Sequence, residues 1–309
     1  MIDVTLLGTA ALMPTPDRAL TAAALTVNGR TLLIDCGEGT QVSVRRWGVS
    51  PMRVDLIALT HYHGDHIFGL PGLLQTMGMQ ARTAPLYIVG PGDVAAELAP
   101  VLQLTGPQPY GIRLLSLPEE GLAPASLLPG WPAEARLTAF PTVHRVISQG
   151  YALTLDRAPK FLPEKARALD VPVSLWNTLQ RGEAVAAGDR IVRPDEVLGP
   201  ARPGIKVVMS GDTTDCPSLE AAARGADLLI SEATYGDDDQ ADMAREHGHM
   251  NFAQAAALAA RAGVKRLWLA HYSQMVEDPA ACLANARAFY PEAVCGEDGL
   301  RILLRFPEA

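Results

Sequence analysis

The chain has 309 residues, of which 48% are hydrophobic and 19% charged, so it can bury one large core or two small ones. No apolar run is long enough to cross a bilayer, no basic segment with a cleavage site follows Met1, and the four cysteines form no Cys-x-x-Cys pair. We therefore expect no membrane span, no secretory signal and no disulfide framework, as in a protein of the reducing cytoplasm. The net charge of −8 does not exclude RNA binding, because a local basic patch is sufficient for it.

Apolar runs separated by turn residues predict a series of strands and helices in the first half of the chain. The predicted strands are 3–7, 21–27, 31–35, 56–59 and 86–89, and the predicted helices are 40–47, 67–79 and 94–104. Asn28-Gly29, between two of the strands, indicates a hairpin. Residues 118–134 are rich in Pro, Gly and Ala and are predicted to form a loop.

The second half repeats this alternation. The predicted strands are 136–144, 206–210, 227–231, 265–270 and 300–306, and the predicted helices are 252–262, with Asn251 as N-cap, and 280–289. Strands that alternate with helices are typical of the α/β class. Both halves carry polar residues at strand ends, which fits two sheets with helices outside, although periodicity alone does not distinguish this sandwich from a doubly wound sheet.

A dense polar cluster follows the strand predicted at 56–59. The sequence Thr60-His61-Tyr62-His63-Gly64-Asp65-His66 holds three of the seven histidines of the chain. Imidazoles and a carboxylate at this spacing are ligands for zinc and similar divalent ions, and loops at strand ends are where functional groups gather. His61 and His63 could reach one ion, and Asp65 and His66 could reach a second. A chance cluster of histidines is the alternative, and the density of the motif disfavours it.

The motif resembles the signature of the metallo-β-lactamase superfamily. Two flanking stretches, Leu33-Ile34-Asp35-Cys36-Gly37-Glu38-Gly39-Thr40-Gln41 and Phe68-Gly69-Leu70-Pro71-Gly72-Leu73-Leu74, make it similar to the ribonuclease Z family, which trims the 3′ end of precursor tRNA. The resemblance runs from Leu6-Leu7-Gly8-Thr9 to the last predicted strand. It implies a single metallo-β-lactamase domain over residues 1–309, with an αββα four-layer sandwich.

The resemblance also implies a complete ligand set, because three single residues at predicted strand ends match family motifs. One zinc ion would be held by His61, His63 and His144, the other by Asp65, His66 and His271, and Asp212 would bridge them. Manganese or magnesium could substitute for zinc. A bridging water or hydroxide would attack the phosphodiester, and Asp65 would orient the water and accept its proton.

The family has a proposed general acid in a His-Ser-Thr sequence, which here reads His249-Met250-Asn251. The resemblance implies that His249 protonates the leaving ribose 3′-oxygen, and Glu232 could hydrogen-bond this histidine and hold it charged. The rival general acid is His247, which we interpret as a solvated loop residue. Asp35 is either a carboxylate that orients a metal ligand or an ordinary turn residue.

The connection 145–211 is longer than a link between two strands requires. Its part 157–193 has seven basic and four acidic residues, a net charge of +3, and resembles the flexible arm with which the family holds tRNA. We expect RNA contacts from Lys160, Lys165, Arg167 and Arg181. An ordinary solvated insertion is the alternative. Residues 171–176 read Val-Pro-Val-Ser-Leu-Trp where the family's arm has a Gly-Pro-rich tip.

Three functions from different classes remain. The leading expectation is a zinc-dependent endoribonuclease that acts on precursor tRNA and, by the same resemblance, forms a homodimer. The second is another hydrolase of the superfamily, acting on a small phosphodiester or ester. The third is a metal-stabilised RNA-binding protein without activity. The surroundings of Asp212, the position of His249 and the arm favour the nuclease, and the full ligand set with Asp65 disfavours the third function.

Overall fold

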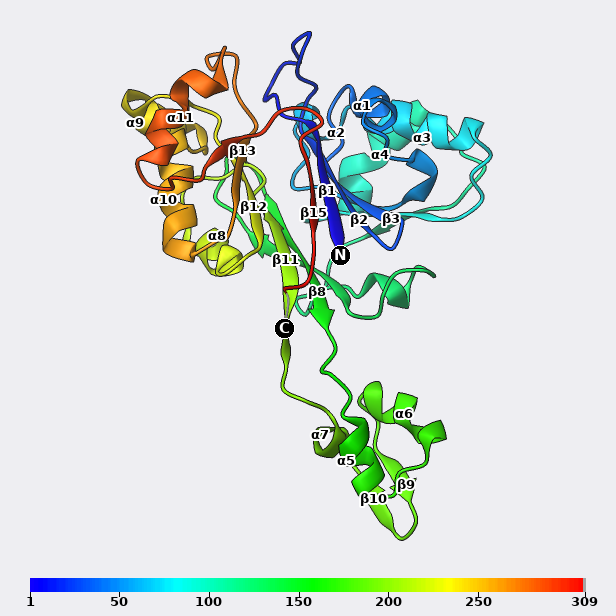
Figure 1. The fold of residues 1–309 in the computed structure, drawn as a ribbon. Coiled ribbons are helices and arrows are strands. Elements are labelled where there is room, and N and C mark those ends of the chain that lie inside the picture. Colours follow the sequence, from blue (N-terminus) through cyan, green and yellow to red (C-terminus); the bar gives the residue numbers. More distant parts are fainter. Residues whose placement is uncertain (308–309) are drawn as a thin grey trace.

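The computed structural model describes residues 1–307. Two β-sheets face each other, and helices cover the outer face of each sheet (Figure 1). This arrangement confirms the αββα sandwich. Within the described part of the chain, no helix combines the length and apolar character that crossing a membrane requires.

The seven-stranded sheet comes from the first half of the chain, with the last strand added at its edge. Its order is β15-β1-β2-β3-β4-β5-β6. The strands are β1 Ile2–Gly8, β2 Ala22–Val27, β3 Arg30–Ile34, β4 Val54–Ala58, β5 Leu86–Val89, β6 Ile112–Leu115 and β15 Arg301–Leu304. The helices of this half are α1 Thr40–Arg46, α2 Gly64–Ile67, α3 Leu70–Met79 and α4 Val94–Thr105. Asn28 and Gly29 have positive φ angles of 50° and 73°, as a two-residue hairpin turn requires, so the predicted hairpin is confirmed.

The six-stranded sheet has the order β14-β13-β12-β11-β8-β7. Its strands are β7 Ala135–Pro141, β8 Gln149–Arg157, β11 Arg202–Met209, β12 Leu228–Glu232, β13 Leu267–Ala270 and β14 Val294–Cys295. The helices of this half are α8 Pro217–Ala223, α9 Ala241–His247, α10 Phe252–Ala262 and α11 Pro279–Arg287. Asn251 caps α10 by accepting a hydrogen bond from the backbone N–H of Gln254, as predicted.

Alternating side chains on each strand divide the apolar residues between the layers. On β12, Leu228 and Ile230 face the core between the two sheets, and Leu229 faces the helices outside. On β2, Leu25 faces the core between the sheets and Ala24 faces the other helical layer. This period of two is what a strand buried on both faces needs.

Two predicted elements near the histidine cluster were wrong in their limits. The helix predicted at 67–79 is broken before α3, because Gly69 packs there against the backbone of Gly37. A β-carbon on Gly69 would lie 2.1 Å from the carbonyl oxygen of Gly37. The strand predicted at 136–144 ends at Pro141, so His144 lies in the loop that follows β7. β8 was missed because the residues between the strands predicted at 136–144 and 206–210 were interpreted as one long insertion.

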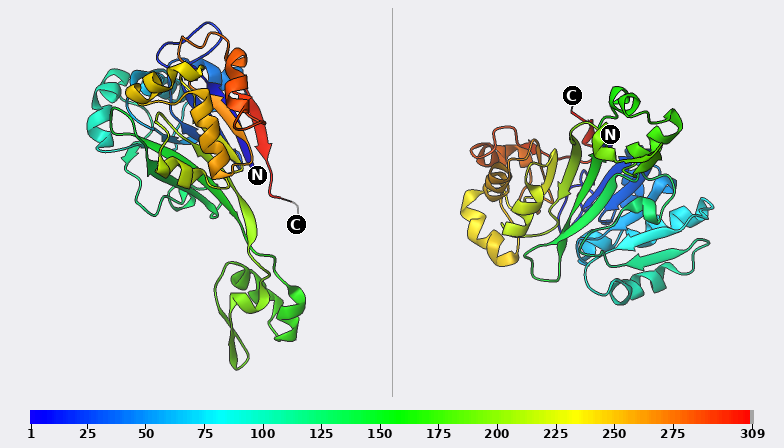
Figure 2. Two further views of the ribbon diagram at one scale, coloured as in Figure 1. Left: turned by 90° about the vertical axis from the view of Figure 1, so that its left-hand side faces the viewer. Right: turned by 90° about the horizontal axis from the view of Figure 1, so that it is seen from below.

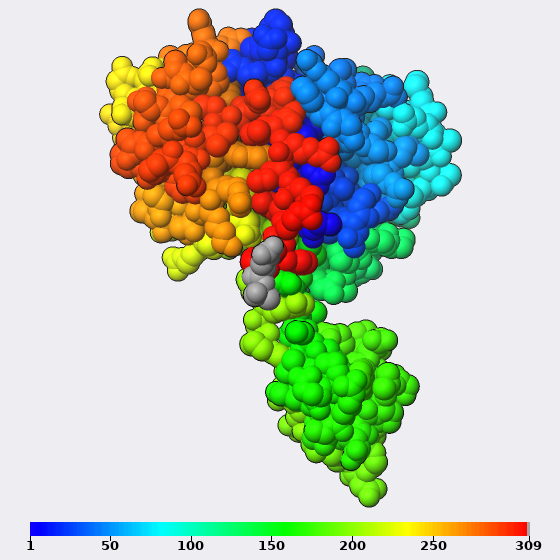
Figure 3. Space-filling model, viewed as in Figure 1, coloured from blue at the N-terminus to red at the C-terminus, as the bar shows by residue number. Residues whose placement is uncertain are grey.

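The inserted arm is residues 158–201, between the ends of β8 and β11, rather than 157–193. It projects from the body on these two strands and forms a separate lobe (Figures 1, 2 and 3). Its elements are α5 Pro163–Ala168, α6 Trp176–Gln180, β9 Val185–Ala187, β10 Arg190–Val192 and α7 Pro194–Val197. Arg157 belongs to the body, where its guanidinium donates to the carbonyl of Pro307 at 2.7 Å.

The arm has a small core of its own that includes Val171, Leu179 and Val192. Residues 171–176 are therefore not its tip, because Val171 is buried and Trp176 begins α6. The hairpin of β9 and β10 lies at the far end instead (Figure 1). With the observed limits the arm has six basic and six acidic residues, so its formal charge is zero rather than +3.

Tyr151 of β8 connects the two sheets directly below the histidine cluster. Its side chain is fully buried and its hydroxyl donates to the carbonyl of Leu59 at 2.7 Å. Gln149 donates to the same hydroxyl at 2.6 Å. Leu59 immediately precedes the motif, so this contact fixes the end of β4 against the opposite sheet.

We predict that Tyr151→Phe lowers the free energy of unfolding by about 1–3 kcal/mol, because the buried carbonyl of Leu59 and the half-buried amide of Gln149 lose their partner. Chemical denaturation of the metal-loaded protein measures this loss. Tyr110→Phe is a matched control, because that buried hydroxyl bonds to the carbonyl of Leu74 within the first half of the chain. The Tyr151 variant should also lose metal affinity and the control should not; equal affinities would show that Tyr151 does not position the cluster.

Candidate active site

The predicted functional residues meet at one edge of the sandwich, where strands of both sheets end. The histidine motif follows β4 in one sheet. In the other sheet, His144 follows β7, Asp212 follows β11, and His271 follows β13. The rigid sheets thus hold four separate loops against one another, which is the usual way a fold assembles a site.

One group of donors consists of His61, His63, His144 and Asp212, whose ligand atoms lie within 4.8 Å of one another. His63 Nδ1 is 2.9 Å from His61 Nε2 and 3.4 Å from His144 Nε2. Asp212 Oδ2 lies 3.6 Å from His61 Nε2. Four atoms that converge in this way can surround one ion.

A second group consists of Asp65, His66 and His271. His66 Nε2 and His271 Nε2 are 3.3 Å apart, and Asp65 Oδ2 lies 3.5 Å from His271 Nε2. Asp212 Oδ1 reaches this group too, at 3.3 Å from His66 Nε2 and 3.2 Å from His271 Nε2. Asp212 therefore directs one carboxylate oxygen at each group.

The donors suit divalent cations. Asp212 Oδ1 is a buried oxygen with no hydrogen-bond partner among the described residues, which is costly unless a cation binds it. Burial and the neighbouring ring of His66 lower the pKa of His61 to about 2, so this ring is neutral, as a metal ligand must be. Two sets of imidazole and carboxylate donors are the usual chemistry of zinc and related ions.

His66 lies between two carboxylates, those of Asp212 and Asp35. Burial by itself lowers its pKa, but the carboxylates of Asp212 and Asp35 raise the pKa of His66 well above its ordinary value. The same carboxylates favour a cation, and a metal ion that binds His66 displaces a proton. At Asp65, burial raises the pKa, but the hydrogen bond to His271 and the charge of His66 lower the pKa below its ordinary value.

Hydrogen bonds to the far nitrogen orient several of the rings. Asp35 Oδ2 is 2.8 Å from His66 Nδ1, and the same carboxylate accepts from the backbone N–H of Thr60 at 2.8 Å. Asp35 thus contacts a predicted ligand, the first of the two roles considered for it. Asp35 and His271 both have positive φ angles, 60° and 61°, a strained backbone that is typical of functional sites.

Three groups that orient the rings were not found from the sequence. Thr234 Oγ1 is 2.9 Å from His271 Nδ1, the carbonyl of Gly248 is 2.9 Å from His144 Nδ1, and Thr60 Oγ1 is 3.1 Å from His61 Nδ1. Such contacts fix the ring tautomer of a metal ligand. Thr60 directly precedes His61 and Thr234 lies two residues after Glu232, and that was their available signal.

His249 lies beside the donor groups and is held by a carboxylate. Its Nδ1 is 2.9 Å from Glu232 Oε1 and 3.2 Å from Thr234 Oγ1. Burial by itself lowers the pKa of His249, but Glu232 raises it to about 9. The predicted contact between Glu232 and His249 is thus present. His249, Asp212 and His271 also form a third possible metal group, which makes His249 an additional potential donor.

The rival residue, His247, was wrongly interpreted as a solvated loop residue. It is the last residue of α9, is half-buried, and its Nδ1 is 2.6 Å from the hydroxyl of Tyr235. The helix end and this hydrogen bond keep it outside the donor groups.

The four arm residues predicted to contact RNA do not belong to this cluster. Lys160, Lys165, Arg167 and Arg181 lie on the exposed surface of the arm. Arg181 pairs with Glu183 at 3.3 Å, and the guanidinium of Arg167 lies over the ring of Trp176.

Comparison with known proteins gives concordant results. The family model described as the metallo-beta-lactamase superfamily matches residues 20–156, and one described as a beta-lactamase superfamily domain matches residues 193–272. Proteins named Ribonuclease Z from Lachnoclostridium phytofermentans and Clostridium tetani are 39% and 40% identical to this chain, each over 99% of both chains. The crystal structure of the short form of human tRNase Z is 27% identical, with a TM-score of 0.68, over 98% of this chain and 100% of its own.

We predict that Asp35→Asn weakens metal binding by roughly 10- to 100-fold, because the substituted amide no longer holds His66 Nδ1 with a negative charge. Competition with a chelator measures the affinity. Asp227→Asn is the control: Asp227 is also buried, but it pairs with Lys265 at the start of β12, away from the donors. An Asp35 variant that binds metal as tightly as this control would remove Asp35 from the site.

Proposed function

Since the chain belongs to the ribonuclease Z family and is a hydrolase with the metallo-β-lactamase fold, we propose that it removes the 3′ trailer of precursor tRNA. It hydrolyses one phosphodiester bond and leaves a 3′-hydroxyl on the tRNA. Similarity to the named relatives over nearly the full chain is the observation that carries this choice of substrate. The two converging donor groups support a metal-assisted hydrolysis.

Two zinc ions per chain fit the donors, with manganese or magnesium as possible substitutes. His61, His63 and His144 would hold one ion, Asp65, His66 and His271 would hold the other, and Asp212 would serve both groups. When bound, the metal pair supplies a Lewis acid for the phosphoryl oxygens and lowers the pKa of water in the site towards neutrality. Asp65 orients the attacking water and accepts its proton. Its Oδ2 also accepts from the backbone N–H of Leu12 at 2.8 Å, which helps to fix the carboxylate.

His249 donates a proton to the leaving ribose 3′-oxygen. Both hydrogen bonds of its ring use Nδ1, so Nε2 is available to the substrate. Glu232 is a positioning residue, because it stabilises the protonated ring without touching the reacting atoms. It also accepts from the backbone N–H groups of Thr213 and Thr234, which fixes the carboxylate in place.

The arm binds the body of the tRNA away from the cut. Lys160, Lys165, Arg167 and Arg181 are exposed on it and can contact phosphates. Its zero formal charge is nevertheless the observation that favours a second candidate, a hydrolase of small phosphodiesters or esters with the same centre. A neutral arm on an acidic body attracts RNA less strongly than the +3 segment expected from the sequence.

Two further properties belong to the proposal. The chain acts as a homodimer, as the family resemblance implies. It works in the cytoplasm, where its four free cysteines stay reduced.

The direct test is incubation of the metal-loaded protein with 3′-extended tRNA, followed by mapping of both product ends. We expect one cut at the junction of tRNA and trailer, with a 3′-hydroxyl on the tRNA. Turnover of a small phosphodiester without cleavage of the RNA would favour the second candidate.

We predict that His249→Ala slows tRNA cleavage by roughly 10²–10⁴, the contribution of a general acid, while metal content stays the same. The loss should be much smaller on a p-nitrophenyl phosphodiester, because that leaving group needs no proton. His247→Ala is the matched control and should change neither rate by more than about threefold. Equal losses of the His249 variant on both substrates would contradict the general-acid role.

We predict that replacing residues 159–200 by a short Gly-Ser linker removes most affinity for precursor tRNA and spares hydrolysis of a small phosphodiester. The double reversal Lys165→Glu with Arg167→Glu should weaken tRNA binding in the same direction, and the salt slope of binding should fall by about one for each lost phosphate contact. Arg113→Glu, at an exposed position of the body, is the control. Unchanged tRNA cleavage after the arm is removed would rule out this role.

A further inference from the structure

Phe68 is the most exposed aromatic residue among residues 1–307, with 65% of its surface open to solvent. Its neighbours Ile67 and Leu70 are buried in the helical layer. The ring of Phe68 is therefore free to contact a ligand through its apolar face.

The ring is held against the histidine motif by local structure. The short helix α2 closes with a hydrogen bond from the Phe68 N–H to the Gly64 carbonyl at 2.9 Å. Residues four apart on a helix share a face, so the ring lies back over Gly64. A β-carbon on Gly64 would meet the ring at 2.3 Å. The ring therefore covers Gly64, which stands between His63 and Asp65 in the motif.

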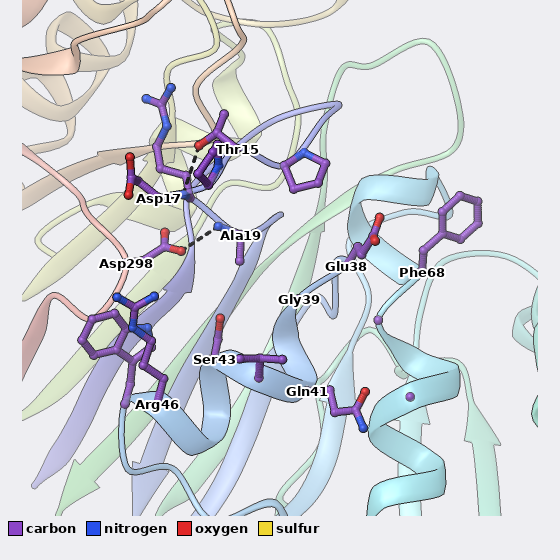
Figure 4. Close-up of a pocket in the computed structure, with 17 residues that line it drawn as sticks. Thr15, Asp17, Ala19, Glu38, Gly39, Gln41, Ser43, Arg46, Phe68 and Asp298 are labelled. Carbon is purple, nitrogen blue, oxygen red and sulfur yellow. Dashed lines mark hydrogen bonds between the residues drawn. The ribbon is translucent and has the colours of Figure 1, made fainter.

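A cleft of about 430 Å³ adjoins Phe68. Phe68 lies at one end of the cleft near Glu38, and its ring points away from Gln41 and Ser43 (Figure 4). None of the seven proposed metal ligands lines the cleft. Phe68 thus borders both the motif that carries donors and a space large enough for a nucleotide base.

A cation, Arg145, lies near His63. Arg145 is exposed and follows His144, and a β-carbon on Gly248 would lie 3.4 Å from its backbone nitrogen. An aromatic ring over the motif and a guanidinium near the same donors match the two parts of a nucleotide, its base and its phosphate.

We propose that Phe68 is a stacking platform for one nucleobase next to the scissile phosphate. This inference rests on the proposed function and extends it, because it assigns a residue that positions the RNA strand across the metal donors. Stacking on an aromatic ring accepts any base, so Phe68 contributes affinity and alignment and does not select sequence.

The test uses metal-loaded full-length protein and 3′-extended tRNA with 2-aminopurine on either side of the cut, one substrate for each position. Emission is recorded on mixing, before product forms. We expect quenching at one of the two positions in the wild type. Phe68→Ala and Phe68→Leu should lose this quenching and raise KM between about fivefold and about a hundredfold, the fold-change that corresponds to one stacked base. Phe68→Tyr and Phe68→Trp should restore both.

Phe289→Ala is the matched control, because Phe289 is 52% exposed and follows α11, away from the donors. If Phe68→Leu shows the same quenching and the same KM as the wild type, the proposal is overturned. Dissociation of a dimer in Phe68→Ala with quenching intact would also overturn it, since the ring would then contact a second copy of the chain. If the wild type does not cleave the RNA, the proposed function fails, and with it this role of Phe68. If the wild type cleaves the RNA and the Phe68 variants have the same quenching and KM, only the stacking platform fails.

Discussion

One buried carboxylate, Asp212, is the constraint on which the rest of the site depends. Removing a charge from water costs several kcal/mol unless opposite charges surround it. Here five imidazoles surround it, and burial is outweighed by His271, His66 and His61, which lower the pKa of Asp212 well below its ordinary value. The backbone before it allows only glycine: Gly211 has a φ of 62°, and a β-carbon there would lie 2.8 Å from Thr60.

From this carboxylate, contacts extend into both sheets. On one side, His66 connects Asp212 to Asp35 at the end of β3. On the other, His271 connects it to Thr234, which hydrogen-bonds Glu232 at 2.7 Å. The metal donors and the proposed proton donor therefore belong to one network of polar contacts. A substitution that displaces this network in either sheet affects the metal donors and the proton donor together.

How much the sequence could predict depended on the distance between partners along the chain. The cluster of His61, His63, Asp65 and His66 was predictable because four donors fall within six residues. His144, Asp212 and His271 are single residues far apart, and only the family resemblance grouped them. The carbonyl of Gly248, which orients His144, could not be predicted, because a backbone contact leaves no trace in the residue type. The arm was wrong in its limits because Arg157 still belongs to β8 and because α7, which follows residue 193, was left out. Its apparent positive charge came from this error, since α7 adds Asp195 and Glu196.

The most direct test of the central claim is the number of metal ions bound per chain, measured by elemental analysis after zinc loading and removal of excess metal, in the wild type and in Asp212→Ala. We expect two ions in the wild type and the loss of both in the variant, because each group of donors relies on one oxygen of the same carboxylate. Two ions retained in Asp212→Ala, or a single ion in the wild type, would contradict a centre built around Asp212.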